Sequence, residues 1–473
     1  MRYNGRRQLT GGVAAEWQVS NKEIRFNLRP NAKWQNGTPV TAHDFVFAWR
    51  KLVSPDTASP SATLASPIKN AVSISRGYKS SDQLGITAIS DHELLIELEH
   101  PCAWCLKLFT NSIFYPINQE HFLLHGYDYG TSLSGHLSNG AYQLATWERG
   151  KKIRLKKNPN YWRADEVKVA RLHFDYIGTD AKTLLNLYRA GEIAIANLNR
   201  DTIPEALEAG LSMRTYPTGH LFNLQFSHLA TRLSANQSLR QAISLVIDKE
   251  ELVNRVVASP GTRIADSMFH DWLTIGNTKF LAARPPKKHK PNIEAAKKYL
   301  AQARRELGLS SERIKLTLTI NDSGLYRRIA EYLQQRLLTH LDIELAIDPQ
   351  ITQMMVKKWR DGTSDIVLLT WPVDVDDPMD QISFLGNPDF RPAFKGLYAG
   401  DEMAELFYLN RDTIEEVARL DAIKKVDDFF SDKVTVFPLF ESYGAAILSP
   451  KIRGYVWQPV RGYADYRYVK VKK

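Results

Sequence analysis

The chain has 473 residues, of which 44% are hydrophobic and 24% are charged, as in ordinary globular proteins. It is too long for one small core, so we expect two or three lobes, and it has no run of about 18 apolar residues that would predict a membrane span. The net charge of +10 is spread along the chain, with dense clusters only at Lys287–Lys290 and near the C-terminal end. This spread argues against a nucleic-acid-binding surface, which usually carries a denser basic stripe.

The N-terminal part of the chain predicts strands around one amphipathic helix. Residues 23–30 and 92–100 alternate apolar and polar side chains, which is typical of half-buried strands. Between them, residues 41–53 predict a helix that Thr41 caps, with Asp44 in its first turn.

The middle of the chain changes to alternating strands and helices. Two strands are predicted at residues 142–147 and 152–156, followed by a strand at 171–177 and a helix at 180–192. A further strand is predicted at 193–198. The order of these elements indicates α/β lobes with mixed sheets.

The same alternation continues in the C-terminal half. Residues 314–320 and 342–349 predict strands, and residues 324–339 between them predict a helix with one apolar face. Residues 365–371 are almost wholly apolar, as expected for a strand that helices cover on both faces.

The only two cysteines, Cys102 and Cys105, form a C-x-x-C motif. Such a motif is compatible with a redox pair, half a zinc site, a local disulfide or two buried thiols. No nearby histidine pair has the spacing of a zinc finger, which leaves the zinc interpretation without its other ligands. The sequence favours a disulfide or buried thiols, but the predicted strand before the motif keeps redox chemistry open.

An acidic stretch at residues 370–385 contains Asp374, Asp376, Asp377 and Asp380 and begins where the apolar strand ends. A calcium loop would need a glycine and a glutamate that are missing, and neighbouring carboxylates in one loop rarely face each other across a sugar. The chain also lacks the nucleophile elbow and the phosphate-binding loop. A solvated acidic loop or an ion pair with a cationic ligand group remains, and ligands do collect at the carboxyl ends of such strands.

From Gly11 to near its end, the chain resembles the extracytoplasmic oligopeptide-binding proteins of ABC importers, a large three-lobed class of solute-binding proteins. The stretches that carry the resemblance are FNLRPNAKWQNGTPVTAHDFVFAWRKLVSPDTASP, SNGAYQLATW, KKNPNYW, YRAGEI, SLRQAISLVIDKEELV and TWPVDVDDP. They follow the order in the family, and the first is long enough to be specific.

The resemblance implies an α/β, three-lobed clamp like that of periplasmic binding proteins, with mixed sheets and hinge closure. We expect a small N-terminal lobe at residues 1–120. A second, discontinuous lobe would comprise 121–218 plus 444–473, and a third lobe, 219–443, would carry the site for the ligand amine.

The resemblance also implies a solute-binding component that captures oligopeptides in an interlobe cleft and delivers them to ABC permease subunits in the inner membrane. We expect no catalysis, no cofactor and no nucleic-acid partner, and a periplasmic monomer. The chain shows no signal peptide and begins later than its relatives, so we expect a truncated N-terminus. Two alternatives stay open, namely a non-peptide ligand such as haem, and an enzyme that uses the Asp374–Asp380 cluster.

The resemblance assigns roles to residues at the acidic stretch. In the family, an aspartate shortly after a strand-end tryptophan pairs with the peptide α-amino group, and here that pattern runs from Trp371 to Asp374. The backbone of Thr370 and Pro372 would hold the peptide main chain, with Pro372 able only to accept. Asp376, Asp377 and Asp380 are expected to be loop charges exposed to water.

Other family positions differ in this chain. Where peptide binders carry basic residues for the ligand carboxylate, the sequence has Trp359, Leu368 and Val257. Tyr326 stands at the position of a histidine, and Ser61 and Ser442 stand at the positions of two tyrosines. We therefore expect these positions to line the ligand site, with the amine end kept and the carboxyl end rebuilt.

Overall fold

The structure is a computed structural model that describes residues 1–310, 312–397 and 399–472, without the side chain of Trp371. Its contacts divide the chain into two compact units. The first unit comprises Met1–Asn197, Ile447–Gln458 and Tyr463–Lys473, and the second comprises Leu198–Ala446 and Pro459–Gly462. The three-lobe division into 1–120, 121–218 plus 444–473, and 219–443 stays a prediction.

The first unit is built from several small sheets, of which the largest has the order β3-β4-β6-β5. A three-stranded antiparallel sheet has the order β7-β8-β9, and short pairs join β1 with β2, β19 with β22 and β20 with β21. The strands of this unit are β1 (Arg2–Tyr3), β2 (Leu9–Thr10), β3 (Ala14–Val19), β4 (Glu23–Leu28), β5 (Ile86–Ser90), β6 (Glu93–Glu97), β7 (Tyr142–Glu148), β8 (Lys152–Lys157), β9 (Arg171–Phe174), β10 (Ile195–Leu198), β19 (Ile452–Arg453), β20 (Val456–Gln458), β21 (Tyr463–Asp465) and β22 (Lys470–Val471). Its helices are α1 (Ala42–Val53), α2 (Ala71–Ser75), α3 (Cys105–Leu108), α4 (Gln119–His125) and α5 (Ala181–Arg189).

Helix α1 begins where its capping residues predict. The Thr41 backbone N–H donates to Asp44 Oδ2 at 2.9 Å, and the two residues form a capping box at the helix N-terminus. Trp34 Nε1 donates to the same carboxylate at 3.2 Å. Burial raises the pKa of Asp44, although these hydrogen bonds favour its charged form. A local sequence signal therefore accounts for the start of this helix.

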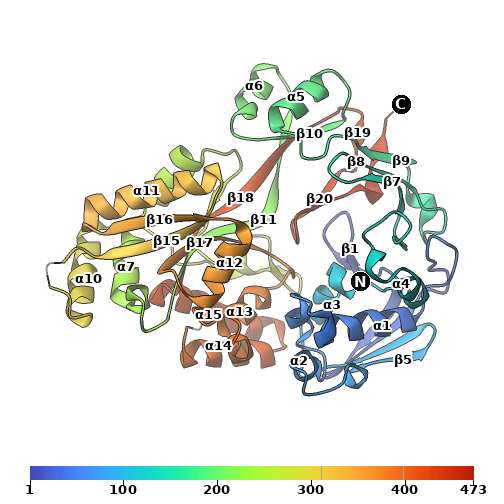
Figure 1. The fold of residues 1–473 in the computed structure, drawn as a ribbon, viewed down its shortest axis with the longest axis horizontal. Helices are drawn as coiled ribbons and strands as arrows, with labels where there is room; N and C mark the ends of the chain where they lie inside the picture. Colours follow the sequence, from blue (N-terminus) through green and yellow to red (C-terminus); the bar gives the residue numbers. More distant parts are fainter. Residues whose placement is uncertain (311, 398, 473) are drawn as a thin grey trace. The chain divides into compact units, whose positions relative to one another are not determined.

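The second unit contains the longer helices and a large mixed sheet (Figure 1). Its helices are α6 (Thr202–Glu208), α7 (Gln237–Leu245), α8 (Lys249–Glu251), α9 (Phe280–Ala283), α10 (Ile293–Glu306), α11 (Gly324–Leu341), α12 (Thr352–Asp361), α13 (Met379–Gly386), α14 (Asp401–Asp412) and α15 (Glu416–Lys433). Its strands are β11 (Met213–Phe226), β12 (Arg263–Ile264), β13 (Thr274–Ile275), β14 (Thr278–Lys279), β15 (Lys315–Asn321), β16 (Glu344–Gln350), β17 (Ile366–Pro372) and β18 (Val436–Leu448).

The central sheet of the second unit runs in the order β18-β11-β17-β15-β16, with β12 also paired to β18. Strand β15 is parallel to both β16 and β17, whereas β11 is antiparallel to β17. Helix α11 connects β15 to β16 and lies along them (Figure 1). The strands and the helix predicted in the C-terminal half are therefore confirmed to within a few residues.

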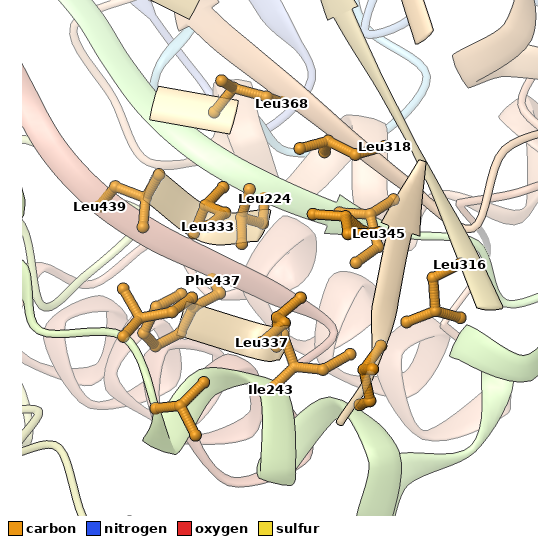
Figure 2. Close-up of a cluster of buried hydrophobic side chains, with 14 of the residues drawn as sticks. Leu224, Ile243, Leu316, Leu318, Leu333, Leu337, Leu345, Leu368, Phe437 and Leu439 are labelled. Carbon is orange, nitrogen blue, oxygen red and sulfur yellow. The ribbon is translucent and has the colours of Figure 1, made fainter. Parts of the chain in front are cut away.

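The main core of the second unit fills the space between this sheet and helices α7, α10 and α11. Figure 2 shows Leu333 and Leu337 of α11 gathered with Leu224 and Leu345 from the strands. A second cluster on α12 and the segment after α13 contains Val367 and Leu369, which alternate along β17 with residues of the main core. Because β17 contributes to both clusters, both of its faces must be apolar, as its sequence predicts.

Candidate functional site

The candidate site lies at one edge of the sheet in the second unit. Because β15, β16 and β17 are parallel, their carboxyl ends at Asn321, Gln350 and Pro372 share this edge. The acidic stretch follows β17 directly, so the fold places its aspartates where ligands collect in open α/β sheets.

One edge of β17 is only partly paired. Strand β11 pairs with β17 along Ile366–Pro372, whereas β15 pairs with it only at Ile366 and Val367. Among the residues that the structure describes, the remaining length of β17 therefore has a strand partner on one side only. Such an edge presents backbone N–H and C=O groups in a pattern that an extended peptide can pair with.

Two of the predicted site residues lie together beside this edge. The hydroxyl of Tyr326, in the first turn of α11, lies 3.1 Å from Thr370 Oγ1. Its ring packs against Phe222, with 5.3 Å between the ring centroids. Burial raises the pKa of Tyr326, so the hydroxyl stays neutral at physiological pH. The structure thus joins a residue after β15 to one near the end of β17.

Asp374 is partly exposed and already has an ionic partner. Its side chain is 27% exposed, and Arg461 Nε lies 3.4 Å from its Oδ1. Its backbone N–H donates to Asp380 Oδ2 at 3.1 Å, which fixes the loop after β17. The carboxylate is therefore held at the sheet edge with one face open to water.

Arg461 comes from a short loop that is attached to the start of the acidic stretch. The Arg461 backbone N–H donates to the Val373 carbonyl at 2.9 Å, and the Val373 N–H donates to the Gly219 carbonyl at 3.3 Å. Gly219 has a φ of 78°, and a Cβ there would lie 2.0 Å from the Pro459 oxygen. Glycine is therefore required at position 219 for this close approach.

The prediction that the other three aspartates are exposed loop charges is wrong. Asp376, Asp377 and Asp380 are 9%, 1% and 5% exposed. Asp376 Oδ1 accepts from the Thr274 N–H at 3.4 Å, and Asp380 accepts from the Asp374 N–H. The physical reason is that the stretch turns inward after Asp374 and opens α13, where its carboxylates are used for internal bonds.

Asp377 forms the most buried ion pair of the stretch. Its two oxygens accept from Arg419 Nη1 at 3.1 Å and Nη2 at 2.7 Å, and the Arg419 side chain is 4% exposed. Asp377 Oδ1 also accepts from the Met379 N–H at 3.0 Å, at the start of α13. A bidentate pair of this kind fixes the direction of both side chains, so Asp377 has a structural role.

Three of the positions expected to line the ligand site lie in the cores. Leu368 has no exposed surface and packs in the main core, as does Val257. Trp359 is buried in the second cluster, where its Nε1 donates to Gln225 Oε1 at 2.8 Å. These side chains are packing residues, and we do not include them in the proposed ligand contacts.

The remaining predicted residues lie on separate elements. Ser442 is half-buried on β18, and its carbonyl accepts from Thr218 Oγ1 at 2.9 Å. Ser61 is half-buried in the first unit, before the short 3-10 helix Ala62–Ala65. The backbone of Trp371 pairs with that of Leu221, but its side chain lies outside the described part of the structure.

Sequence reasoning missed Arg461 and Arg419, which form ion pairs with Asp374 and Asp377. Neither lies in a recognisable motif, and both are far from the aspartates along the chain. The one available signal was charge balance, because buried carboxylates need cations or hydrogen-bond donors.

The C-x-x-C motif forms a disulfide between Cys102 and Cys105. Cys105 begins α3, shortly after β6, and both cysteines are buried. This finding is in line with a disulfide and not with two free buried thiols, and a redox pair, whose oxidised form is the same disulfide, stays a hypothesis. Within the described residues, no group of three or more histidine, cysteine and acidic side chains is arranged to hold a metal ion.

Comparison with known proteins places the chain in a family. A model of the bacterial extracellular solute-binding proteins, family 5 (middle region), matches residues 8–390. The chain belongs to this family. Its α/β, periplasmic-binding-protein-like fold is thereby confirmed, as is its resemblance to oligopeptide-binding proteins.

This family 5 protein is similar to several oligopeptide-binding proteins, and the similarity extends over nearly its full length. The oligopeptide-binding protein OppA of Bacillus subtilis is 25% identical over 91% of this chain and 79% of its own. The substrate-binding domain of an oligopeptide ABC transporter from Bacillus anthracis has a TM-score of 0.83 at 25% identity, covering 100% of this chain and 92% of its own. OppA of Listeria monocytogenes, solved with a bound peptide, has a TM-score of 0.80 at 26% identity, covering 98% and 90%.

The family consists of extracellular solute-binding proteins. Among the helices that the structure describes, none has the length and the apolar character required to cross a membrane.

Proposed function

We propose that this family 5 protein binds oligopeptides outside the cytoplasm and delivers them to the permease of an ABC importer, without catalysis of its own. The names of its relatives support a peptide ligand, because one of them was solved with peptide bound and others are oligopeptide-binding proteins. Delivery to a permease in the inner membrane and a periplasmic location are part of the same proposal.

The observation that carries the proposal is that a partly exposed carboxylate, Asp374, closely follows a strand whose edge is only partly paired. Asp374 follows β17 by two residues, so a peptide that paired with the β17 edge could place its α-ammonium at this carboxylate. Backbone groups of Thr370 and Pro372 would bind the peptide main chain, which makes affinity largely independent of the peptide sequence. Tyr326 and Ser442 are the neighbouring side chains that we assign to the ligand contacts.

The arrangement gives less support to an enzyme that uses the Asp374–Asp380 cluster. Three of its four carboxylates are buried, and Asp377 is held by Arg419 in a bidentate pair. Acid–base chemistry on a substrate requires carboxylates that reach it, and here only Asp374 has a substantially exposed side chain.

The test is calorimetric titration of the full chain with trialanine and with N-acetyl-trialanine. If Asp374 holds the α-ammonium, Asp374→Ala should weaken trialanine binding by about 2–5 kcal/mol, or roughly 30- to several-thousand-fold. The acetylated peptide should bind weakly to both proteins. Glu331→Ala, which removes an exposed carboxylate from the surface of α11, is the matched control and should bind as the parent does.

The proposal fails if the acetylated peptide binds as tightly as the free one, or if Asp374→Ala and Glu331→Ala behave alike. Absence of any peptide binding, together with visible absorbance changes on titration with haem, would support a non-peptide ligand on the same fold.

A further inference from the structure

We propose that Arg461 is the resident counter-ion of Asp374, so that a ligand ammonium binds at this carboxylate by replacing one cation with another. The inference rests on the proposed function, because it takes Asp374 as the anchor for the ligand amine. It adds a specificity-determining residue from a distant part of the chain.

The geometry of the Arg461–Asp374 pair is that of a displaceable contact. Arg461 Nε lies 3.4 Å from Asp374 Oδ1, and the two side chains are 39% and 27% exposed. Water therefore reaches both partners, and exposed pairs of this kind are worth little in free energy. By contrast, Arg419 holds Asp377 through two hydrogen bonds in the interior.

The loop fixes the backbone of Arg461 and leaves its long side chain as the part that can move. Arg461 has a φ of 60°, in the left-handed region that residues with a Cβ seldom adopt. Its backbone N–H donates a hydrogen bond to the carbonyl of Val373, one residue before Asp374. This bond keeps the base of the Arg461 side chain close to the Asp374 carboxylate. A backbone conformation of this kind persists when the surrounding structure imposes it, and such conformations cluster at ligand sites.

The charges of the acidic stretch favour a cation over an anion as the incoming group. The stretch places Asp374, Asp376, Asp377 and Asp380 close together along the chain, and Arg419 and Arg461 form ion pairs with Asp377 and Asp374. An ammonium that takes the place of the guanidinium keeps a cation at Asp374, whereas a ligand carboxylate would place a second negative charge beside it. The ligand class is therefore a peptide or another small molecule with a free primary amine.

The test is a titration with trialanine of variants that remove the Arg461 guanidinium and whose new residue tolerates the left-handed backbone conformation at this position. Arg461→Asn is suitable because asparagine adopts left-handed φ values more readily than most residues, and Arg461→Gly serves as a second variant. The matched control is Arg7→Asn, because Arg7 also has a φ of 60° and is exposed, but lies in the first unit. Thermal unfolding of each variant checks that it is folded.

With its resident cation removed, Asp374 should bind the peptide amine about two- to fivefold more tightly in both Arg461 variants. The gain should disappear in the background of Asp374→Asn and should be absent for N-acetyl-trialanine and for Arg7→Asn. If Asp374→Asn loses affinity but the Arg461 variants bind the peptide as the parent does, or more weakly, the inference about Arg461 is overturned. If Asp374→Asn itself binds normally, the proposed amine anchor is wrong.

Discussion

Two arginine–aspartate pairs within one short acidic stretch differ in almost every physical respect. Arg419 and Asp377 are nearly inaccessible and share two hydrogen bonds, whereas Arg461 and Asp374 are partly exposed, with 3.4 Å between Nε and Oδ1. A buried pair is costly to break, and an exposed pair costs little. The difference matches a structural role for Asp377 and the exchangeable ligand contact that we propose for Asp374.

The largest effect should come from breaking the buried pair. Asp377→Ala leaves the Arg419 guanidinium buried without this carboxylate and should lower the free energy of unfolding by about 3–5 kcal/mol. Asp374→Ala should lower it by less than about 1 kcal/mol, because Arg461 is exposed to water. Urea unfolding of both variants measures the contrast.

A double variant sharpens this test. Replacing Asp377 by Ala and Arg419 by Met together also removes the buried positive charge of Arg419. Much of the stability that Asp377→Ala loses should therefore return. Similar unfolding free energies for the two single variants would contradict the structural role of Asp377.

A buried aspartate that accepts a hydrogen bond from a serine should behave in the opposite way. Asp427 is buried, and its Oδ1 accepts from Ser267 Oγ at 2.6 Å. Burial raises its pKa to about 6, although Lys424 and Lys287 act to lower it. Because the folded protein holds this proton more tightly than the unfolded chain, the resulting stability is complete below the unfolded pKa of about 3.9 and is lost as the pH rises through about 6.

Asp427→Asn is neutral at every pH and retains an acceptor for Ser267. Above pH 6 the variant should therefore exceed the parent in unfolding free energy by about 2–3 kcal/mol, with the difference vanishing near pH 4. Urea titrations at pH 4, 5 and 7.5 give the curve, and a pH-independent difference would show that Asp427 does not titrate as described.

The smallest effect concerns the neutral contact beside the acidic stretch. Tyr326→Phe removes the hydroxyl that lies 3.1 Å from Thr370 Oγ1 but keeps the ring against Phe222. Stability should fall by about 0.5–1.5 kcal/mol, as for one uncharged hydrogen bond. Thermal unfolding at two pH values below 8 should give the same loss, since burial raises the Tyr326 pKa and the hydroxyl stays neutral. A loss that changed over this range would contradict a neutral contact.

The elements of the fold could be predicted because their signals are local. The apolar run at 365–371 became β17, and the one-sided pattern at 324–339 became α11, since both patterns follow from which faces are buried. The start of α1 followed from Thr41 and Asp44, which satisfy backbone donors within one turn.

The candidate site was predicted only in part, because its outcome depends on residues distant in the chain. The position of Asp374 after β17 followed from the sequence, but the burial of its neighbours depends on Arg419 and on α13. Leu368 was assigned to the ligand by family position alone. Its place on the side of β17 that faces α11 instead makes it a core residue.

The loop Pro459–Gly462 has a consequence for dividing the protein into fragments. By its contacts the loop belongs to the second unit, although the segments before and after it, Ile447–Gln458 and Tyr463–Lys473, belong to the first. A recombinant fragment that ended at Ala446 would keep β17 and Asp374 but would lose Arg461 and the hydrogen bond to the Val373 carbonyl. Its Asp374 would then lack the arginine that accompanies it in the intact chain, so ligand affinities measured on such a fragment would not transfer to the whole protein.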